Sequence, residues 1–141
     1  MRFLSCYVPN LRFGNSSWLD FIFSDLFEIS NGINKDKSCF GKGTSIINYM
    51  DVNKHAFLYK SMIKGLVESN EKEQQVYSVY TTDILVTRTS ETKDEIAYTS
   101  CVLEKIEKCV FSGFLLRARP KTKDINTIFM VYLLRSNEYR K

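Results

Sequence analysis

Apolar residues are grouped in short runs along most of this chain, and only its last segment repeats them at helical spacing. Residues 84–86 are three consecutive aliphatic side chains bounded by threonines, a pattern typical of a buried strand. Residues 126–140 carry apolar side chains at Ile128, Phe129, Tyr132 and Leu133, which predicts one helical face. Asn126 can cap this helix. Such alternation of short strands with one longer helix favours an α+β chain.

The remaining segments fit the same class. We predict two strands joined by a turn within residues 18–29, and strands at 46–50, 62–67, 96–103 and 111–119, the last ending at Pro120. A long loop is expected at 31–44, a short capped helical turn at 69–73 and an exposed loop at 88–92. With 141 residues, 44% of them apolar, the chain suffices for one core. The prediction is a single α+β domain with a mixed, largely antiparallel curved sheet, a few short helices and a C-terminal helix.

Several classes of protein are disfavoured by what the sequence lacks. No run approaches the ~18 apolar residues of a membrane helix, and the first ten residues do not have the pattern of a secretory signal. We therefore expect a cytoplasmic protein with no membrane contact. The spacing of the four cysteines gives no zinc-binding pair, so we expect no metal, no cofactor and buried reduced thiols. These cysteines are Cys6, Cys39, Cys101 and Cys109.

Charge is unevenly distributed along the chain. Twenty Lys and Arg against sixteen Asp and Glu give a net charge of +4. Residues 1–65 carry a net +3, residues 66–110 a net −4 and residues 111–141 a net +5. Basic ends around an acidic middle suggest a positive face that meets phosphates. A solvated surface of uneven charge is the alternative interpretation.

Catalytic patterns are sparse. His55 is the only histidine, and it lies in a polar stretch without a serine elbow, which favours a structural or solvent-facing role. The sequence Gly41-Lys42-Gly43-Thr44 lacks the spacing of a phosphate-binding loop. One constellation is compatible with catalysis: Asp83, Glu91 and Lys93 are the residue types with which Mg-dependent nucleases hold a metal and activate water.

A second constellation consists of contact groups for nucleic acid. Basic loops at residues 35–42, 88–91 and 117–123 are interleaved with Asn, Ser and Thr. Arg can bond a guanine edge and Asn an adenine edge, while Lys, Ser and Thr hold phosphates, so the set suits duplex DNA. Arg88 follows the rigid strand 84–86 and is the leading base reader; alternatively it forms a surface ion pair with Glu91 or Glu95. The predicted contacts are Asn31, Asn34, Lys35, Lys37, Lys42, Thr44, Tyr49, Thr87, Arg88, Thr89, Ser90, Arg117, Arg119 and Lys121.

The order of motifs resembles the target-recognition domain of type I restriction-modification specificity subunits. The matching pieces are VPNLRF (8–13), Trp18 with DLFEISNG (25–32), INYMDV (47–52), TDILVTRTSET (82–92), VFSGFLLRARP (110–120) and YLLRSNEYRK (132–141). Two departures are the apolar Phe21-Ile22-Phe23, where the family is usually charged, and Ser24 in place of a common Gly.

This resemblance implies a DNA-reading component without catalytic residues. In such systems two recognition domains, spaced by long helices, read the halves of a split target and deliver it to methyltransferase and endonuclease subunits. The family continues beyond the position of Lys141, so the resemblance implies that residues 1–141 are a single, N-terminal and incomplete recognition domain. Besides the nuclease hypothesis, one further alternative stays open, a non-binding remnant of a truncated specificity gene.

Overall fold

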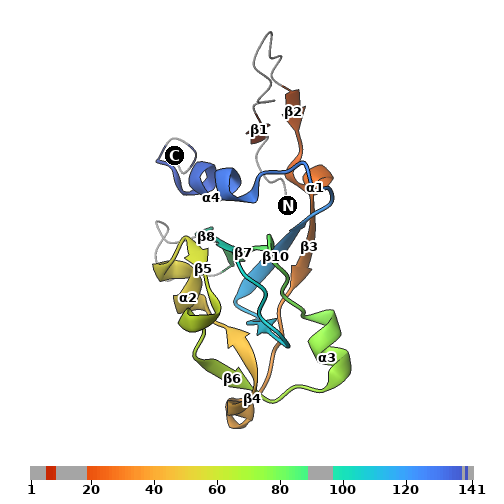
Figure 1. Cartoon of the computed structure of the whole chain (residues 1–141), viewed down its shortest axis with the longest axis vertical. Helices are drawn as coiled ribbons and strands as arrows, with labels where there is room; N and C mark the ends of the chain where they lie inside the picture. The colour runs from red at the N-terminus through yellow and green to blue at the C-terminus, as the bar shows by residue number, and fades with distance from the viewer. Residues whose placement is uncertain (1–5, 9–18, 89–96, 138, 140–141) are drawn as a thin grey trace.

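The computed structural model describes residues 6–8, 19–88, 97–137 and 139, with side chains from residue 22 onward (Figure 1). Its strands are β1 (Cys6–Val8), β2 (Leu19–Phe21), β3 (Phe27–Asn31), β4 (Phe40–Ile47), β5 (Phe57–Leu58), β6 (Gly65–Val67), β7 (Ile84–Thr87), β8 (Thr99–Val102), β9 (Val110–Phe111) and β10 (Leu115–Pro120). Its α-helices are α1 (Phe23–Leu26), α2 (Tyr49–Lys54), α3 (Glu71–Val76) and α4 (Thr127–Arg135), and its 3-10 turns are η1 (Lys37–Cys39) and η2 (Lys60–Met62).

A five-stranded sheet forms the centre of the molecule. Its strand order is β3-β10-β7-β8-β5, antiparallel except for the parallel pair β5 and β8. A second sheet has the order β6-β4-β9, with β4 parallel to β9, and β1 pairs with β2 in a small ladder. Figure 1 shows α4 along the upper end of the central sheet and the start of β4 at the lower end. The predicted α+β domain with a mixed, largely antiparallel sheet and a C-terminal helix is confirmed.

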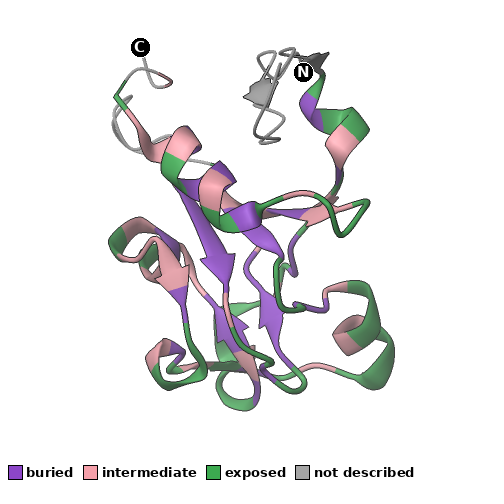
Figure 2. Ribbon diagram, turned by 45° about the horizontal axis from the view of Figure 1, so that its top comes forward, coloured by how far each residue is buried: buried purple, intermediate pink, exposed green. Residues whose placement is uncertain are grey.

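Alternation along the central strands divides the core between the two faces of the sheet. Ile84, Cys101 and Ala118 pack with Phe23, Phe27 and the buried side of α4 on one face. Leu85, Val102 and Leu115 pack with α2 and the second sheet on the other face. Figure 2 shows the buried residues concentrated in these central strands. Because both faces are covered, the inner strands β7 and β8 are almost entirely buried, whereas the edge strand β3 exposes Glu28.

Side-chain caps begin α3 and α4 where the sequence predicts them. The Asn70 Oδ1 accepts from the Glu73 N–H at 2.9 Å, and a Glu73 carboxylate oxygen accepts from the Asn70 N–H at 2.9 Å. The Asn126 Oδ1 accepts from the Phe129 N–H at 3.0 Å, which confirms its role at the start of α4. The Asp51 carboxylate accepts from the Asn48 N–H at 2.8 Å. This last cap ends the strand at Ile47 and starts α2 at Tyr49, so the strand predicted for residues 46–50 overlaps β4 only at Ile46 and Ile47.

Three further predictions are wrong in part. The loop expected at residues 31–44 is a strand from Phe40 onward, because Gly41 and Gly43 adopt φ of +96° and +99° and let β4 continue through an irregular register with β6. The strand expected at 111–119 is two strands in different sheets, β9 and β10, separated by a turn at residues 112–114. The turn expected near Ser24 is the single-turn helix α1.

The predicted face of α4 is also wrong. Its buried residues are Thr127, Met130, Val131 and Leu134. Ile128 and Tyr132, which the spacing placed in the core, are exposed. Most side chains of α4 are apolar, so two different faces of the helix have the spacing of a buried apolar face. The face that packs on the sheet is the one with the more compact side chains. At its end, Arg135 donates to the backbone oxygens of Thr99 at 2.5 Å and Val52 at 2.7 Å, which ties α4 to β8 and α2.

Candidate nucleic-acid interface

Three chain segments meet at one end of the central sheet. β10 runs antiparallel to both of its neighbours, with Leu116 opposite Asn31 and Leu115 opposite Thr87. The C-terminal ends of β3 and β7 therefore lie at the same sheet edge as the beginning of β10. Arg88 follows β7 directly and Phe114 precedes β10 directly. Strand pairing thus brings Asn31, Arg88 and Phe114 together from positions far apart in the sequence.

Hydrogen bonds connect these residues. An Arg88 guanidinium nitrogen donates to the Asn31 Oδ1 at 3.3 Å, and the Arg88 N–H donates to the Phe114 carbonyl oxygen at 3.0 Å. Arg88 and Asn31 are exposed, and the Phe114 side chain is 63% exposed. The ion pair of Arg88 with Glu91 or Glu95, the alternative from the sequence, involves residues outside those described. The partner that the structure shows for the Arg88 guanidinium is the neutral Asn31 amide. This contact therefore does not neutralise the positive charge of Arg88.

Asn34 lies next to the same group because the segment around Gly32 passes very close to the turn at residues 112–113. A Cβ on Gly32 would lie 2.0 Å from the Ser112 carbonyl oxygen, so only glycine permits this passage of the chain. The passage is fixed by the Ile33 N–H to the Phe111 oxygen and by the Gly113 N–H to the Ile33 oxygen, both 2.9 Å. Gly113 in turn lies against the Asn34 side-chain amide. We call the exposed residues Asn31, Asn34, Arg88 and Phe114 the strand-end cluster.

The three predicted lysines of the 31–44 segment differ in their partners. The Lys35 Nζ lies 2.7 Å from a Glu73 carboxylate oxygen, and this hydrogen-bonded pair raises the pKa of Lys35 and lowers the pKa of Glu73. The Lys42 Nζ lies 3.0 Å from a Glu68 oxygen in a well-exposed pair, which contributes little. Lys37 is exposed in η1. Lys37 and Lys42 can therefore reach a polyanion, while Lys35 is already neutralised.

Three predicted polar contacts are turned inward. Thr44 accepts hydrogen bonds from the Ser69 hydroxyl at 2.6 Å and from the Gln74 amide at 3.2 Å. Thr87 is buried, and its hydroxyl accepts from the Tyr98 N–H at 2.9 Å. Tyr49 begins α2 with its hydroxyl buried. The hydroxyls of Thr44 and Thr87 stabilise a loop and a strand end, and none of the three side chains presents its polar atom at the surface.

The two arginines of β10, Arg117 and Arg119, form a network on the face of the central sheet that also carries Leu85. Arg117 is 4% exposed, and its guanidinium donates to the Ser78 carbonyl oxygen at 2.6 Å and to the Ser30 hydroxyl at 3.2 Å. Burial lowers the pKa of Arg117, and the nearby charge of Arg119 lowers it further. The Arg119 Nε and Nη2 donate to the two carboxylate oxygens of the buried Asp83 at 2.9 and 2.8 Å. We call Asp83, Arg117 and Arg119 the buried arginine network.

Arg119 carries its charge despite partial burial. Burial acts to lower the pKa of Arg119, but the hydrogen bonds and the charge of Asp83 outweigh burial and leave this pKa raised. The guanidinium also lies 4.0 Å from the centroid of the Tyr80 ring. Lys121 is exposed just beyond Pro120. It follows the opposite end of β10 from Phe114, about 20 Å away for six extended residues. The structure does not bring Arg117, Arg119 or Lys121 to the strand-end cluster.

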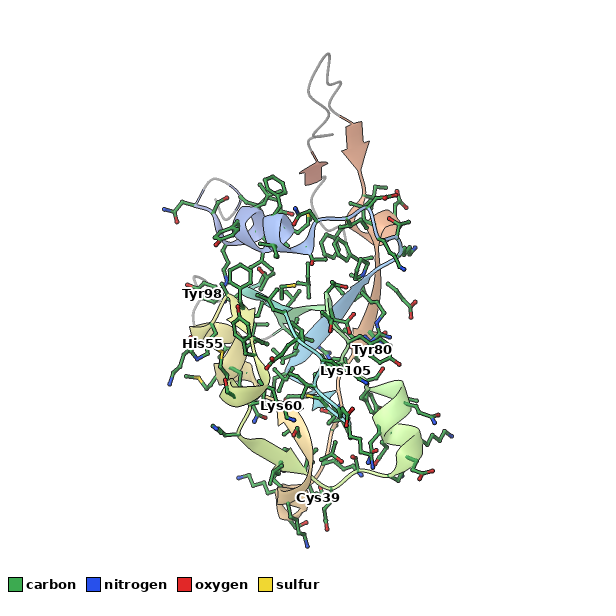
Figure 3. All side chains as sticks on the ribbon, in the orientation of Figure 1. Cys39, His55, Lys60, Tyr80, Tyr98 and Lys105 are labelled. Atoms are coloured by element: carbon green, nitrogen blue, oxygen red, sulfur yellow. The ribbon has the colours of Figure 1, made fainter. Side chains whose placement is uncertain are left out.

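The nuclease constellation keeps one member within the described residues. Both Asp83 oxygens are occupied by Arg119, and one also accepts from the Tyr80 N–H at 2.7 Å. Thr89, Ser90, Glu91 and Lys93 lie outside the described residues. No group of three potential metal-ligating side chains occurs in the part of the chain that is described. His55 ends α2, where its backbone oxygen accepts from Arg135 at 3.1 Å (Figure 3).

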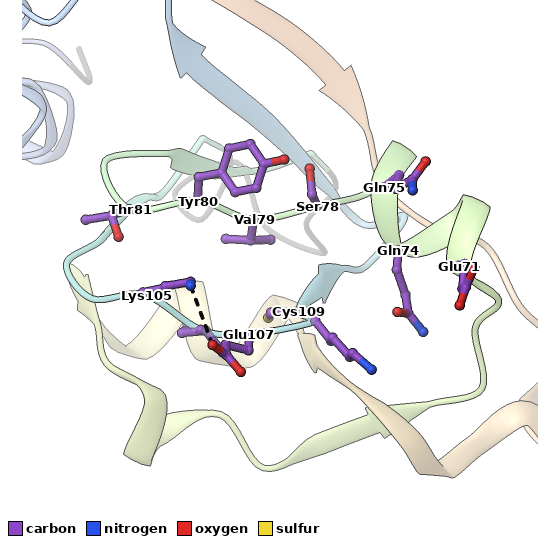
Figure 4. Close-up of a pocket in the computed structure, with 12 residues that line it drawn as sticks. Glu71, Gln74, Gln75, Ser78, Val79, Tyr80, Thr81, Lys105, Glu107 and Cys109 are labelled. Atoms are coloured by element: carbon purple, nitrogen blue, oxygen red, sulfur yellow. Dashed lines mark ion pairs between the residues drawn. The ribbon is translucent and has the colours of Figure 1, made fainter.

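A cleft that the sequence did not indicate lies between α3 and residues 105–109. It encloses about 720 Å³, and Tyr80 and Lys105 lie on opposite sides of it (Figure 4). Lys105 forms a 3.5 Å ion pair with Glu107 at its rim. Its lining shares no residue with the strand-end cluster. The residues lining it are Glu71, Gln74, Gln75, Ser78, Val79, Tyr80, Thr81, Lys105, Ile106, Glu107, Lys108 and Cys109.

The expected buried thiols are found at two positions. Burial raises the pKa of Cys109 to about 12 and also raises the pKa of Cys101, whose thiol donates to the Thr127 hydroxyl. Cys39 is half-buried, and all three are free thiols. Among the described segments α4 is the longest helix, with nine residues, and none is long and apolar enough to cross a membrane.

Comparison with known proteins identifies a likeness of fold. The structure is similar to part of a chain in a solved structure of a type I restriction-modification (R-M) system, reported for its complex assembly and conformational transition. The TM-score is 0.56 at 12% sequence identity, and the match covers 83% of this chain and 26% of that chain. At this identity the likeness concerns the fold. The sequence matches no family model and no curated protein.

Proposed function

We propose that this chain is a sequence-specific double-stranded DNA recognition domain of a type I R-M system. The strand-end cluster carries the proposal: exposed Arg and Asn side chains, which suit guanine and adenine edges, project from strands held in a two-sided core. A rigid base is what a reader of base edges requires. Lys37 and Lys42 supply phosphate contacts, and Thr89 and Ser90, next in the chain after Arg88, are proposed as further contacts.

The place of the domain in such a system is part of the proposal. The fold likeness to a chain of a type I R-M system supports it, as does the order of motifs along the sequence. We infer that residues 1–141 read one half of a split target and hand it to methyltransferase and endonuclease subunits. The domain contributes affinity and selectivity and has no catalytic centre of its own. Within the proposal Arg117 and Arg119 stabilise the fold, and Asp83 holds Arg119 in place of a metal ion.

Selection from a random duplex pool tests the proposal directly. The purified chain is incubated with the pool, bound duplexes are amplified over several rounds, and enrichment of one motif is the expected result. Nonspecific binding typically has a Kd of ~10⁻⁴ to 10⁻⁶ M at physiological salt and weakens steeply as salt rises. A pool that stays unenriched through all rounds would contradict sequence-specific recognition.

A parallel incubation with Mg²⁺ addresses the nuclease alternative. Supercoiled plasmid should remain intact in the presence of the chain and Mg²⁺, because the Asp83 carboxylate is fully engaged. Nicking that disappears in Asp83→Asn would overturn the non-catalytic assignment. Nicking that persists in this variant would indicate a contaminating nuclease.

A further inference from the structure

Phe114 stands out among the residues that the structure describes because it is a large apolar side chain placed in solvent by a rigid turn. It is 63% exposed, directly beside Arg88 and one residue from the glycine that contacts Asn34. An exposed aromatic ring stabilises the isolated domain little, so packing does not account for its position.

The backbone N–H groups of residues 112–115, beneath the ring, are all hydrogen-bonded. Ser112 N–H donates to the Ile47 oxygen, Gly113 N–H to the Ile33 oxygen and Leu115 N–H to the Ser112 oxygen, at 2.9–3.0 Å. Phe114 N–H donates to the Ser112 hydroxyl at 3.3 Å, and its carbonyl oxygen accepts from Arg88. The turn is thereby attached to both sheets and to the segment after β7. A ring on such a turn is held ready for contact, with little backbone ordering required on binding.

The neighbours of the ring indicate what it would contact. In the major groove Arg recognises guanine, Asn recognises adenine, and an apolar side chain contacts the C5-methyl group of thymine. The strand-end cluster holds all three chemistries within one hydrogen-bonded group. We propose that Phe114 reads a thymine methyl group in the major groove, beside the base edges read by Arg88 and an asparagine. This inference rests on the proposed function and adds an apolar specificity residue to it.

The test removes one methyl group from the DNA. In the duplex enriched by selection, each thymine is replaced in turn by deoxyuridine, which differs only by the C5-methyl group. At one position the full chain should bind about fourfold more weakly, the factor that corresponds to about 0.8 kcal/mol for one such group removed from water. Phe114→Ala should weaken binding to the thymine duplex by a similar factor or more and should bind the thymine and deoxyuridine duplexes equally.

Matched controls isolate the ring. Tyr132 is 62% exposed on α4, away from the cluster, and Tyr132→Ala should keep both the affinity and the sensitivity to deoxyuridine. The thermal unfolding midpoint of Phe114→Ala should equal that of the parent, because the ring is exposed and its turn is held by hydrogen bonds that the variant keeps. Phe114→Leu should retain part of the sensitivity.

The outcomes separate this inference from the proposed function. If no duplex is enriched, the proposed function itself fails. If a duplex is enriched but no deoxyuridine position depends on Phe114, or the motif has no A·T pair, only this inference is overturned. If Phe114→Ala weakens binding and 2-aminopurine fluorescence shows an unstacked step next to the ring, Phe114 acts as a wedge between bases. That result would also overturn thymine recognition.

Discussion

Arginines at two places on the central sheet have opposite surroundings. In the buried arginine network Arg117 is 4% exposed, and Arg119 is paired with both oxygens of a buried aspartate. In the strand-end cluster Arg88 is exposed and bonded to the neutral Asn31. All three residues are arginines in or directly after strands of the same sheet, and their position relative to the strand decides the difference. An arginine inside a strand faces a core layer, whereas one just after a strand reaches solvent.

The comparison shows where charge is available to a ligand. The arginines of the network already donate to partners within the fold, although the buried Arg117 Nε has none among the described residues, and using the network for DNA would require breaking bonds to Ser78, Ser30 and Asp83. Among the described residues, the cluster would give up one side-chain hydrogen bond, from the Arg88 guanidinium to the neutral Asn31 amide. Substitutions in the buried arginine network should therefore change mainly the stability of the fold, and substitutions in the strand-end cluster should change mainly the binding of DNA.

Removing the acid of the network should have the largest effect. Asp83→Ala leaves Arg119 and the Tyr80 N–H without their acceptor, and we expect a loss of about 3 kcal/mol in the free energy of unfolding. Urea denaturation followed by circular dichroism measures it. Asp124→Ala, at an exposed aspartate, is the control and should stay within about 0.5 kcal/mol of the parent. A loss below about 1 kcal/mol for Asp83→Ala would mean that Arg119 rehydrates freely.

Removing the arginine of the cluster should affect binding instead. Arg88→Ala should cost about 1–3 kcal/mol in binding to the selected duplex and relax preference at one position, with stability unchanged within about 0.5 kcal/mol. Lys72→Ala, on the exposed side of α3, is the charge-matched control. Equal losses on selected and scrambled duplexes would make Arg88 a phosphate contact and would leave base reading to residues 31–44.

The two exposed lysines should contribute equally to the binding of every duplex, whatever its DNA sequence. Lys37→Ala and Lys42→Ala are each expected to weaken all duplexes alike, by roughly fivefold at 0.15 M salt if one phosphate contact is lost. The slope of log K against log salt should fall by about one for each variant. Fluorescence anisotropy at several salt concentrations provides both quantities. A sequence-dependent loss for either lysine would move that residue into the base-reading group.

The smallest effect should come from releasing a lysine that the fold has neutralised. Glu73→Gln removes the partner of Lys35, so nonspecific affinity should rise about twofold and the salt slope should steepen by less than one. Lys35→Ala in the parent should have little effect on binding, which is the matched control.

The same pair has a predictable pH dependence. The hydrogen bond from Lys35 is the main reason why the pKa of the Glu73 carboxyl lies below its ordinary value of 4.5. The stabilisation that this pair gives to the folded state is therefore present above pH 4.5 and is lost as the pH falls through the lowered pKa of Glu73. A difference in stability between the parent and Glu73→Gln that stays constant down to pH 2 would contradict this assignment.

The sequence predicted those parts of the fold that local interactions determine. The strand at 84–86 lies in β7, and the caps at Asn70 and Asn126 begin α3 and α4. What it could not predict depends on distant partners. The split between β9 and β10 follows from pairing with two different sheets, and the buried face of α4 is selected by the shape of the sheet beneath it.

The candidate site shows the same limit. Arg88 is exposed after a buried strand, as predicted, because strand and exit lie next to each other in the sequence. Arg117 and Arg119 were predicted as contacts from charge alone. Their partners Ser78 and Asp83 are at least 36 positions away, so only the folded chain reveals that Arg117 is buried and that Arg119 is paired with a buried aspartate. Phe114 gave no polar signal and became a candidate only through its exposure.

The turn that carries Phe114 also determines how easily this surface can change. Its hydrogen bonds are made by the backbone and by Ser112, with none from the side chain at position 114. The φ of Phe114 is not positive, so any residue other than proline, which would remove the N–H that donates to Ser112, fits the backbone there. One codon can therefore be replaced while the scaffold stays folded. A lineage that carries this turn can explore new target sequences at position 114 without first acquiring compensating mutations in its core.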